Sequence, residues 1–400
     1  MNYFKNSVVN IYFFIFIFWL SFFSELLPLS KNIYFFYFSW GVFLWGILTH
    51  KDVRRKVYGK ENILFWVYLS GIAVFSWKVN FLYGSGIYRD TTFVKFVSFI
   101  IPTYFLARYF LTPEILKKLV LFWILCGIIV VLIGIGEFFF HENLIYERFI
   151  YNFFYERFIS THRMMATFIH PNILGAYLIA LLPLTFYYKK NRWLFYFSFS
   201  VIITGIILSF SRGTWMAGIL ITFIYLIAKK KIKIVVLLVV FILIFTTFLQ
   251  FLSSESLLSW ELKRRLGIIN LVNYILKGHR TYRYWIGWKM FLDYPISGVG
   301  WGCFRTMIDN YASPGVLSHE IKIPDSVYLM HLAESGIIGF LPFIGLIFST
   351  LKKQKDKLSP VAFSFYGLGF NFFTFDGFLW TSTLLLFWFL LGILNTDIQI

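Results

Sequence analysis

Apolar runs of about 20 residues recur along the whole chain, and no other feature of the sequence restricts its fold so strongly. Such a run can cross lipid only as a helix or a barrel strand, because lipid cannot hydrogen-bond to exposed backbone groups. The runs lack the apolar–polar alternation of barrel strands. The sequence therefore predicts an all-α polytopic membrane protein, and a hydrophobic fraction of 59% with 14% charged residues agrees with this class.

We expect about 12 membrane-spanning helices joined by short polar segments. The first apolar run, residues 8–29, has no small-residue cleavage site behind it, so it is expected to remain as a span rather than to be removed as a signal peptide. The expected spans are residues 9–29, 32–50, 62–78, 92–112, 118–140, 172–188, 193–210, 214–228, 234–252, 326–350, 360–375 and 378–395.

Basic residues orient these spans. The net charge of +18 would suit a nucleic-acid partner, but many of the basic residues lie in five short clusters between apolar runs. Such clusters mark cytoplasmic loops, so the sequence predicts two cytoplasmic termini and no nucleic-acid partner. The clusters comprise Lys51, Arg54, Arg55, Lys56 and Lys60; Lys117 and Lys118; Lys189, Lys190 and Arg192; Lys229, Lys230, Lys231 and Lys233; and Lys352, Lys353, Lys355 and Lys357.

The outer side of the membrane then receives only two sizeable segments, residues 141–171 and residues 253–325. Within the second, residues 264–278 have apolar side chains at helical spacing and basic residues at both ends, which favours a helix lying in the membrane interface. No internal repeat is visible. We therefore expect one membrane domain over residues 1–400, with 253–325 as an external cap between the ninth and tenth spans.

Arginines gather on this outer side. Arg212 lies in the stretch SFSRGT, residues 209–214, where a turn divides two expected spans. A guanidinium facing lipid would cost several kcal/mol, so Arg212 is expected either to snorkel at a helix end or to face a polar cavity. Arg163 precedes another helix start, and Arg280 and Arg283 precede a proline- and glycine-rich run. Those glycines indicate either a plain connector or a tight turn that comes close to a ligand.

Three further polar residues follow in the stretch PDSVYLMHLAESGIIGF, residues 324–340. Asp325 stands at an external helix start, where it can serve as an N-cap or as a functional carboxylate. His331 and Glu334 lie one turn apart and deeper in the span. His331 is consistent with a packed polar residue, whereas an intramembrane carboxylate such as Glu334 is costly and generally paired or functional.

Several arginines and a carboxylate at one membrane surface, without metal-ligand spacing, suit a particular chemistry. Guanidinium forks match phosphate oxygens, which a lipid diphosphate presents at this depth. A carboxylate beside them can accept a proton from an attacking hydroxyl, while the arginines stabilise the departing diphosphate. The two cysteines, Cys126 and Cys303, give neither a disulfide framework nor a metal pattern. The pattern predicts metal-independent glycosyl transfer from a polyprenyl diphosphate-linked sugar.

The same stretches resemble the O-antigen ligase family, which includes related polysaccharide polymerases. SRGTWMA, residues 211–217, is similar to the family's Ser-Arg-Gly motif, and GHRTYRYW followed by DYPISGVGWGCF resembles its arginine and Pro-(x)2-Gly-x-Gly-x-Gly segment. DSVYLMHLAESGIIG, residues 325–339, resembles the stretch in which ligases carry His-Asn or His-Ser, nine residues and Gly-x-x-Gly. The resemblance covers residues 163–340, with four motifs in the family's order.

The resemblance implies en bloc transfer of a glycan from undecaprenyl diphosphate to an acceptor at the outer face of the bacterial inner membrane. It implies neither a cofactor nor a metal. Arg212 and Arg280 correspond to residues that contact the diphosphate, Arg163 is placed to assist, and Arg283 is the substitute if Arg280 is misaligned. Asp325 occupies the position of the ligases' base histidine, and His319 is the alternative base. This departure favours polymerase-type chemistry, in which the acceptor is another lipid-linked glycan rather than the lipopolysaccharide core.

Two other classes of function remain open at this point. A transporter or flippase for lipid-linked sugars would show internal repeats and charged residues near the bilayer midplane, whereas here the arginines gather at one surface. A structural or assembly subunit would leave that gathering unexplained.

Overall fold

The computed structural model describes residues 2–25, 29–83, 86–140, 163–233, 236–237, 279–312, 324–354 and 356–396. Every regular element within these residues is a helix, and none of them forms a strand. The prediction of an all-α chain is therefore confirmed for the described residues.

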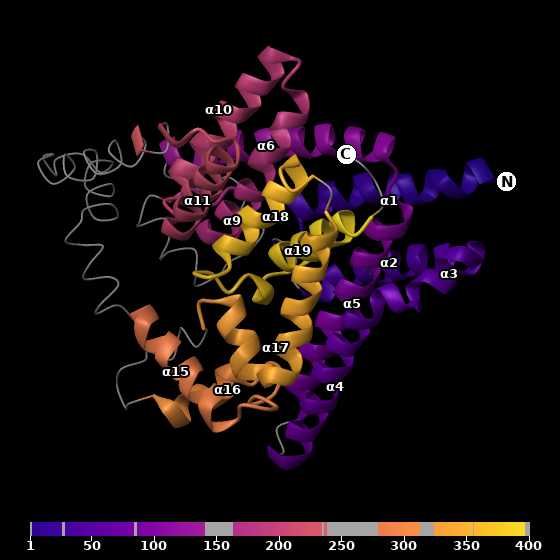
Figure 1. Ribbon diagram of the computed structural model, residues 1–400, viewed down its shortest axis with the longest axis vertical. Helices are drawn as coiled ribbons and strands as arrows, with labels where there is room; N and C mark the ends of the chain where they lie inside the picture. The colour runs from indigo at the N-terminus through magenta and orange to yellow at the C-terminus, as the bar shows by residue number, and fades with distance from the viewer. Residues whose placement is uncertain are drawn as a thin grey trace, which may run out of the picture.

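The first half of the chain forms long helices that lie on one side of the molecule (Figure 1). Their length follows from nearly continuous apolar sequence without an internal glycine–proline break. The elements are α1 (Asn2–Phe22), α2 (Leu29–Thr49), α3 (Lys51–Val57), η1 (Lys60–Asn62), α4 (Ile63–Tyr83), α5 (Gly86–Phe110) and α6 (Pro113–Phe140).

The second half has shorter helices, and prolines or polar caps begin several of them. The elements are α9 (Pro171–Leu181), η2 (Leu182–Tyr188), α10 (Arg192–Leu208), α11 (Arg212–Ala228), α15 (His279–Asp293), α16 (Phe304–Tyr311), α17 (Val327–Lys353), α18 (Pro360–Asn371), η3 (Gly377–Leu379) and α19 (Thr381–Leu394).

Each expected span has a corresponding helix except 234–252, which lies outside the described residues apart from 236–237. Among the described residues, three stretches are long and apolar enough to cross a membrane, namely Pro113–Phe139, Pro171–Tyr188 and Val327–Lys353, and several apolar helices are shorter. The total of about 12 spans stays a prediction. The expected interfacial helix at 264–278 also lies outside the described residues.

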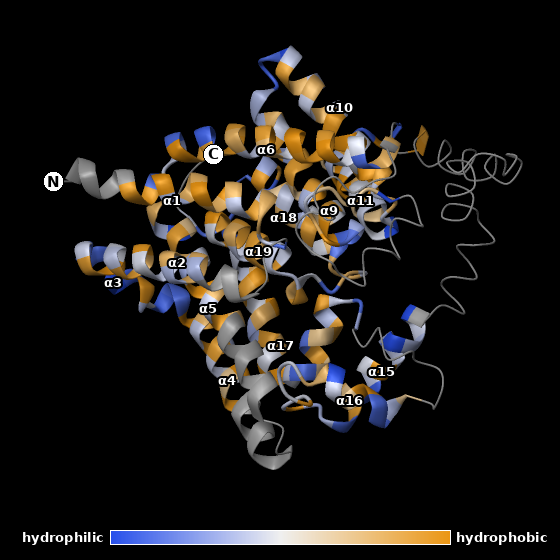
Figure 2. Ribbon diagram, turned by 180° about the vertical axis from the view of Figure 1, so that it is seen from behind, coloured by the Kyte–Doolittle hydropathy of each residue, from blue (hydrophilic) through white to orange (hydrophobic). Residues whose placement is uncertain are grey.

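Helix α19 forms the centre of the bundle. All its residues from Thr381 to Leu394 are buried, and it packs against α5 and α18. Figure 2 shows hydrophobic residues along the central helices, with hydrophilic residues in α3, at the start of α10 and in α15 and α16. Polar ends around an apolar middle are what a bilayer requires of a helical bundle.

Helix α17 is interrupted within the expected span 326–350, although Val327–Lys353 as a whole is long and apolar enough to cross a membrane. Gly336 has φ 57° and ψ −160°, so the helix is broken there. The glycine-rich loop docks on this break: Val299 N–H donates to Ala333 O (2.8 Å) and Gly300 N–H to Glu334 O (2.9 Å). A Cβ on Gly298 would overlap the Glu334 backbone. Gly298 thus permits a close approach of the loop to α17.

Candidate active site

The Ser-Arg-Gly motif lies where two helices meet. Helix α10 ends at Leu208 and α11 begins at Arg212, which confirms a turn in SFSRGT. Phe210 adopts a left-handed backbone with φ 47°. The Arg163 guanidinium donates to the carbonyls of Ser209 (3.2 Å) and Phe210 (3.4 Å) at this turn. Arg163 therefore orders the turn that carries Arg212, while its proposed contact with a diphosphate stays a prediction.

The first turn of α11 packs against the segment that follows α18. Asn371 Nδ2 donates to Thr214 Oγ1 at 3.0 Å. A Cβ added to Gly213 would overlap the Thr374 side chain, so the glycine of the motif permits this close approach. Residues 371–374 therefore lie next to the turn that carries Arg212, although they are far from it in the sequence.

Arg280 and Arg283 of α15 both reach Asp325. Arg283 Nη2 lies 2.6 Å from Asp325 Oδ2, and Arg280 Nε lies 3.7 Å from Asp325 Oδ1. The Arg283 and Asp325 side chains are each 8% exposed, whereas that of Arg280 is 24% exposed. One helical turn separates the two arginines, so α15 presents both on the face toward α17. The structure thus joins three of the residues that the sequence singled out.

Asp325 does not cap α17. Ser326 is the N-cap residue, and its side chain accepts a hydrogen bond from Leu329 N–H at 3.4 Å. Asp325 has a left-handed backbone with φ 54°, which turns its carboxylate toward α15. The interpretation of Asp325 as a simple N-cap is therefore wrong, because the next residue performs that task.

The segment after α18 is hydrogen-bonded to the same group. Val327 N–H donates to Phe372 O at 3.0 Å, and Arg280 Nη1 donates to Thr374 O at 3.1 Å. The Tyr284 hydroxyl lies 3.2 Å from Phe373 O and 3.3 Å from Asp325 O. Thr374 consequently links Arg280 to the Ser-Arg-Gly turn, because its side chain lies against Gly213.

Burial and the neighbouring charges have opposite effects on the pKa of Asp325. Burial raises the pKa of its carboxyl group above the ordinary value, while Arg280 and Arg283 act to lower it. Within the described residues, Arg283 Nε and Nη1 have no hydrogen-bond partner although both are buried. Unfilled buried donors are costly, by about 1–3 kcal/mol each, so they need an explanation such as a ligand.

Two titratable residues of this region escaped the sequence analysis. Asp376 is 3% exposed, and burial followed by the charge of Asp325 raises its pKa to about 7. The pKa of His170 lies well below its ordinary value, first because of burial and then because of Arg163 and Arg280. The expected spans already put both residues at outer turns, which is the signal that could have identified them.

The remaining predicted residues lie elsewhere. His331 is fully buried, and its Nε2 lies 2.7 Å from the Tyr68 hydroxyl of α4. Glu334 Oε1 accepts a hydrogen bond from Phe304 N–H at 3.0 Å. His319 lies outside the described residues. A supporting role for these three residues stays a prediction.

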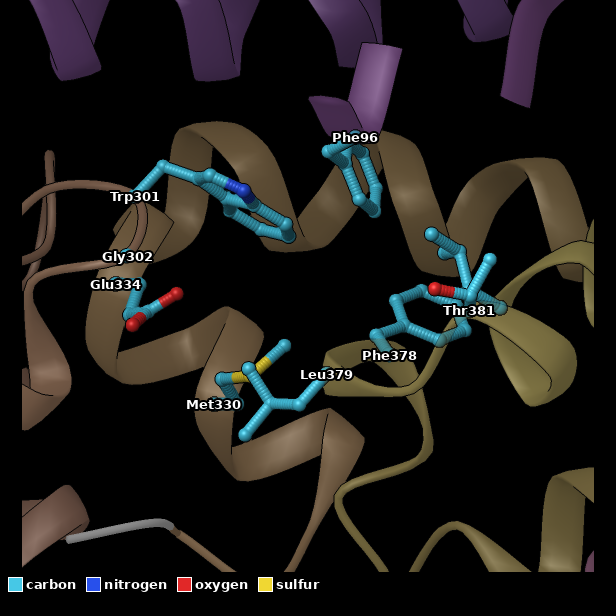
Figure 3. A pocket seen from close by; sticks show the side chains of 9 residues that line it. Phe96, Trp301, Gly302, Met330, Glu334, Phe378, Leu379 and Thr381 are labelled. Atoms are coloured by element: carbon cyan, nitrogen blue, oxygen red, sulfur yellow. The ribbon is translucent and has the colours of Figure 1, made fainter. Parts of the chain in front are cut away.

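A small pocket beside α17 is shown in Figure 3. Its volume is about 60 Å³, which is enough for water molecules but not for a sugar ring. Glu334 supplies its carboxylate, and Trp301, Phe96 and Phe378 supply aromatic walls. The pocket lies between α17 and the segment after Asp376, and its lining includes neither Asp325 nor the two arginines of α15.

Comparison with known proteins agrees with the motifs. No curated protein matches the chain. The family model described as O-antigen ligase matches residues 197–344, a stretch that holds Arg212, Arg280, Arg283 and Asp325 but ends before Asp376. Residues 197–344 are therefore similar to the O-antigen ligase family, which agrees with the resemblance seen in the motifs of that stretch.

Proposed function

We propose that this membrane protein is a glycosyltransferase that moves a glycan en bloc from a polyprenyl diphosphate to an acceptor hydroxyl. The observation that carries the proposal is the buried group in which Arg280 and Arg283 hold Asp325 beside the Ser-Arg-Gly turn. Anion-binding groups and a proton acceptor are the two components that this transfer requires.

The diphosphate is bound by Arg280 and Arg212 in this proposal. Arg280 is the more exposed of the two arginines beside Asp325, so it can contact a substrate without leaving its carboxylate partner. Arg212 is half-buried in the first turn of α11, where backbone N–H groups and the helix dipole favour an anion. Arg163 assists by ordering the turn.

Asp325 acts as the general base. It accepts the proton of the acceptor hydroxyl as that oxygen forms a bond to the anomeric carbon of the donor glycan. The bond between the anomeric carbon and the diphosphate oxygen breaks, and its electron pair leaves with the diphosphate, whose charge the arginines stabilise. Arg283 orients the Asp325 carboxylate through the 2.6 Å contact.

We further propose that the donor is undecaprenyl diphosphate-linked glycan and that the site faces the periplasm, with both termini cytoplasmic in the inner membrane. Asp325 in place of the ligases' histidine favours polymerase-type transfer to a second lipid-linked glycan. Substituting Asp325→His tests this kinship, because histidine should restore part of the activity that Asp325→Asn removes.

A transporter remains the second candidate, and the broken helix α17 is the observation in its favour. Transporters often bind substrates at discontinuous helices, and Gly336 interrupts α17 two residues after the buried Glu334. The arginine cluster lies near the start of α17 rather than at this break. This arrangement supports the transferase over the transporter.

Reconstitution distinguishes the two candidates. Proteoliposomes containing the purified protein and a polyprenyl diphosphate-linked glycan should release free polyprenyl diphosphate and yield an extended or transferred glycan. Asp325→Asn should suppress both products. Movement of the intact lipid between leaflets without diphosphate release would instead establish a flippase and contradict the transferase.

A further inference from the structure

Asp376 is a buried carboxylate that the proposed transfer does not yet use. It lies in the short connection between α18 and α19, and its backbone carbonyl accepts a hydrogen bond from Leu379 N–H at 3.0 Å. Its side chain is 3% exposed, and its Oδ2 atom has no hydrogen-bond partner among the described residues. Burying a carboxylate oxygen without a hydrogen-bond partner is costly, so the position of Asp376 calls for a functional explanation.

Charged and titratable groups face Asp376 from several elements. The chain just before Asp376 is bonded to α15 and α17: Thr374 O accepts a hydrogen bond from Arg280 Nη1 at 3.1 Å, and Phe372 O accepts one from Val327 N–H at 3.0 Å. These contacts bring Asp376 into the region of Asp325 and its two arginines. His170 lies at the start of α9, with its ring centroid 6.1 Å from that of Trp380. Glu25 accepts hydrogen bonds from Ser382 at the start of α19. Asp376 and Asp325 are therefore two acids that share one set of arginines.

The two carboxylates are not equivalent. Asp325 has an arginine nitrogen 2.6 Å from its Oδ2, whereas Asp376 has no ion pair within 4.0 Å in the described part of the chain. Two like charges in one buried site do not both ionise readily, and the less well paired acid keeps the proton. In agreement with this geometry, burial and then the charge of Asp325 raise the pKa of Asp376 to about 7.

We propose that Asp376 is the proton-sharing partner of Asp325, taking over the proton that Asp325 accepts during transfer. This inference rests on the proposed function and adds a residue from beyond the stretch that matches the family. Asp376 does not touch the substrate, so it is a positioning and proton-holding residue.

The proton balance closes without a further reactant. The acceptor hydroxyl gives its proton to Asp325 as the glycosidic bond forms, and the departing diphosphate takes the electron pair of the broken bond. The proton then passes to Asp376 and afterwards to water, which restores the ionised pair. As the pH falls through about 7, Asp376 becomes protonated before turnover, so transfer by the wild-type protein should decrease on the acid side.

The test compares Asp376→Asn, Asp376→Glu and the control Asp293→Asn, an exposed carboxylate at the end of α15. In proteoliposomes, Asp376→Asn should reduce transfer by about 10- to 100-fold at its optimum, because a weaker base remains. It should also move the acid limb of the pH–rate profile down by about one pH unit, because Asp325 loses its like-charged neighbour. Asp376→Glu should keep the limb near pH 7, and Asp293→Asn should match the wild type.

A purely structural role for Asp376 would lower transfer without moving the acid limb, and that result would overturn the proposal. Infrared difference spectroscopy of the purified protein gives a readout that does not depend on transfer. In a Glu334→Gln background, which removes a second buried carboxyl group, a protonated-carboxyl band that titrates near pH 7 should be present with Asp376 and absent with Asp376→Asn. If the band persists in the Asp376→Asn variant of that background, the inference fails. If the band behaves as expected but the wild type transfers no glycan, the proposed function fails and the shared proton stands.

Discussion

Two buried arginines, Arg108 and Arg283, lie on helices at opposite sides of the molecule and are partnered in different ways (Figure 1). Arg108 Nη1 donates to Asn62 Oδ1 and to the Tyr104 hydroxyl, and Nη2 pairs with Glu61 at 3.2 Å. Arg283 uses only Nη2, in its contact with Asp325, and its other two nitrogens have no hydrogen-bond partner in the described part of the chain.

The two arginines differ in how many donors are left over: in the described part of the chain Arg108 leaves only Nε without a hydrogen-bond partner, whereas Arg283 leaves both Nε and Nη1. Arg108 is satisfied mainly by neutral groups and one half-exposed carboxylate, all within α5 and the nearby η1. The Arg283 group unites α15, the start of α17 and the segment after α18, and it contains two carboxylates. The more complete network is typical of a residue that stabilises a fold, whereas a less complete network where several charges converge is typical of a binding site.

The largest effect is expected from Asp325→Asn. Removing the proton acceptor while keeping the shape of the side chain should reduce transfer about 10²- to 10⁴-fold. The variant should insert and purify like the wild type, because Ser326 still caps α17. Transfer in proteoliposomes measures the effect. If this variant transferred glycan at the wild-type rate, Asp325 would not be the general base, and its cluster would be structural like that of Arg108.

Arg212→Lys is expected to reduce transfer about 10²-fold. Lysine keeps the positive charge but loses the planar fork that binds two phosphate oxygens at once. The loss should appear in the steady-state rate with lipid-linked donor, while insertion into the membrane and thermal stability stay unchanged. A variant that transfers as fast as the wild type would return Arg212 to the role of a snorkelling residue at a helix end.

Arg280→Ala and Arg283→Ala should differ in kind. Arg280→Ala removes the more exposed guanidinium and should weaken donor binding, seen as a raised KM. Arg283→Ala removes the closest partner of Asp325, so the pKa of Asp325 rises and the acid limb of transfer moves to higher pH. The pH–rate profile separates the two variants, and the reverse pattern would exchange the roles of the two arginines.

The smallest effect on transfer is expected from Arg108→Ala. Its buried hydrogen bonds to Asn62 and Tyr104 would be lost, which should lower the free energy of unfolding by about 1–3 kcal/mol. Thermal unfolding in detergent measures that loss. Transfer per folded molecule should equal that of the wild type. A large decrease would show that the Arg108 cluster also takes part in transfer.

The sequence already predicted the helices of the described residues, the turn at Arg212 and the candidate arginines. Apolar length is a local property, and the cost of leaving backbone groups unbonded in lipid makes helices its only outcome here. The motif glycines could also be identified in the sequence, but the contacts that require them could not. Only the structure shows that Gly298 approaches the backbone of α17 and that Gly213 leaves room for Thr374.

What the sequence determined by itself was therefore the class of protein and the residue types that meet at its candidate site. The tertiary structure decided which of them touch. From the sequence, Asp325 could be an N-cap or a base. The structure shows that Ser326 is the N-cap of α17 and that Arg283 pairs with the Asp325 carboxylate. Asp376 had no motif at all, because its environment is created by helices that lie far away in the chain. Burial and neighbouring charge set the pKa of a carboxyl group, and both depend on packing rather than on local sequence.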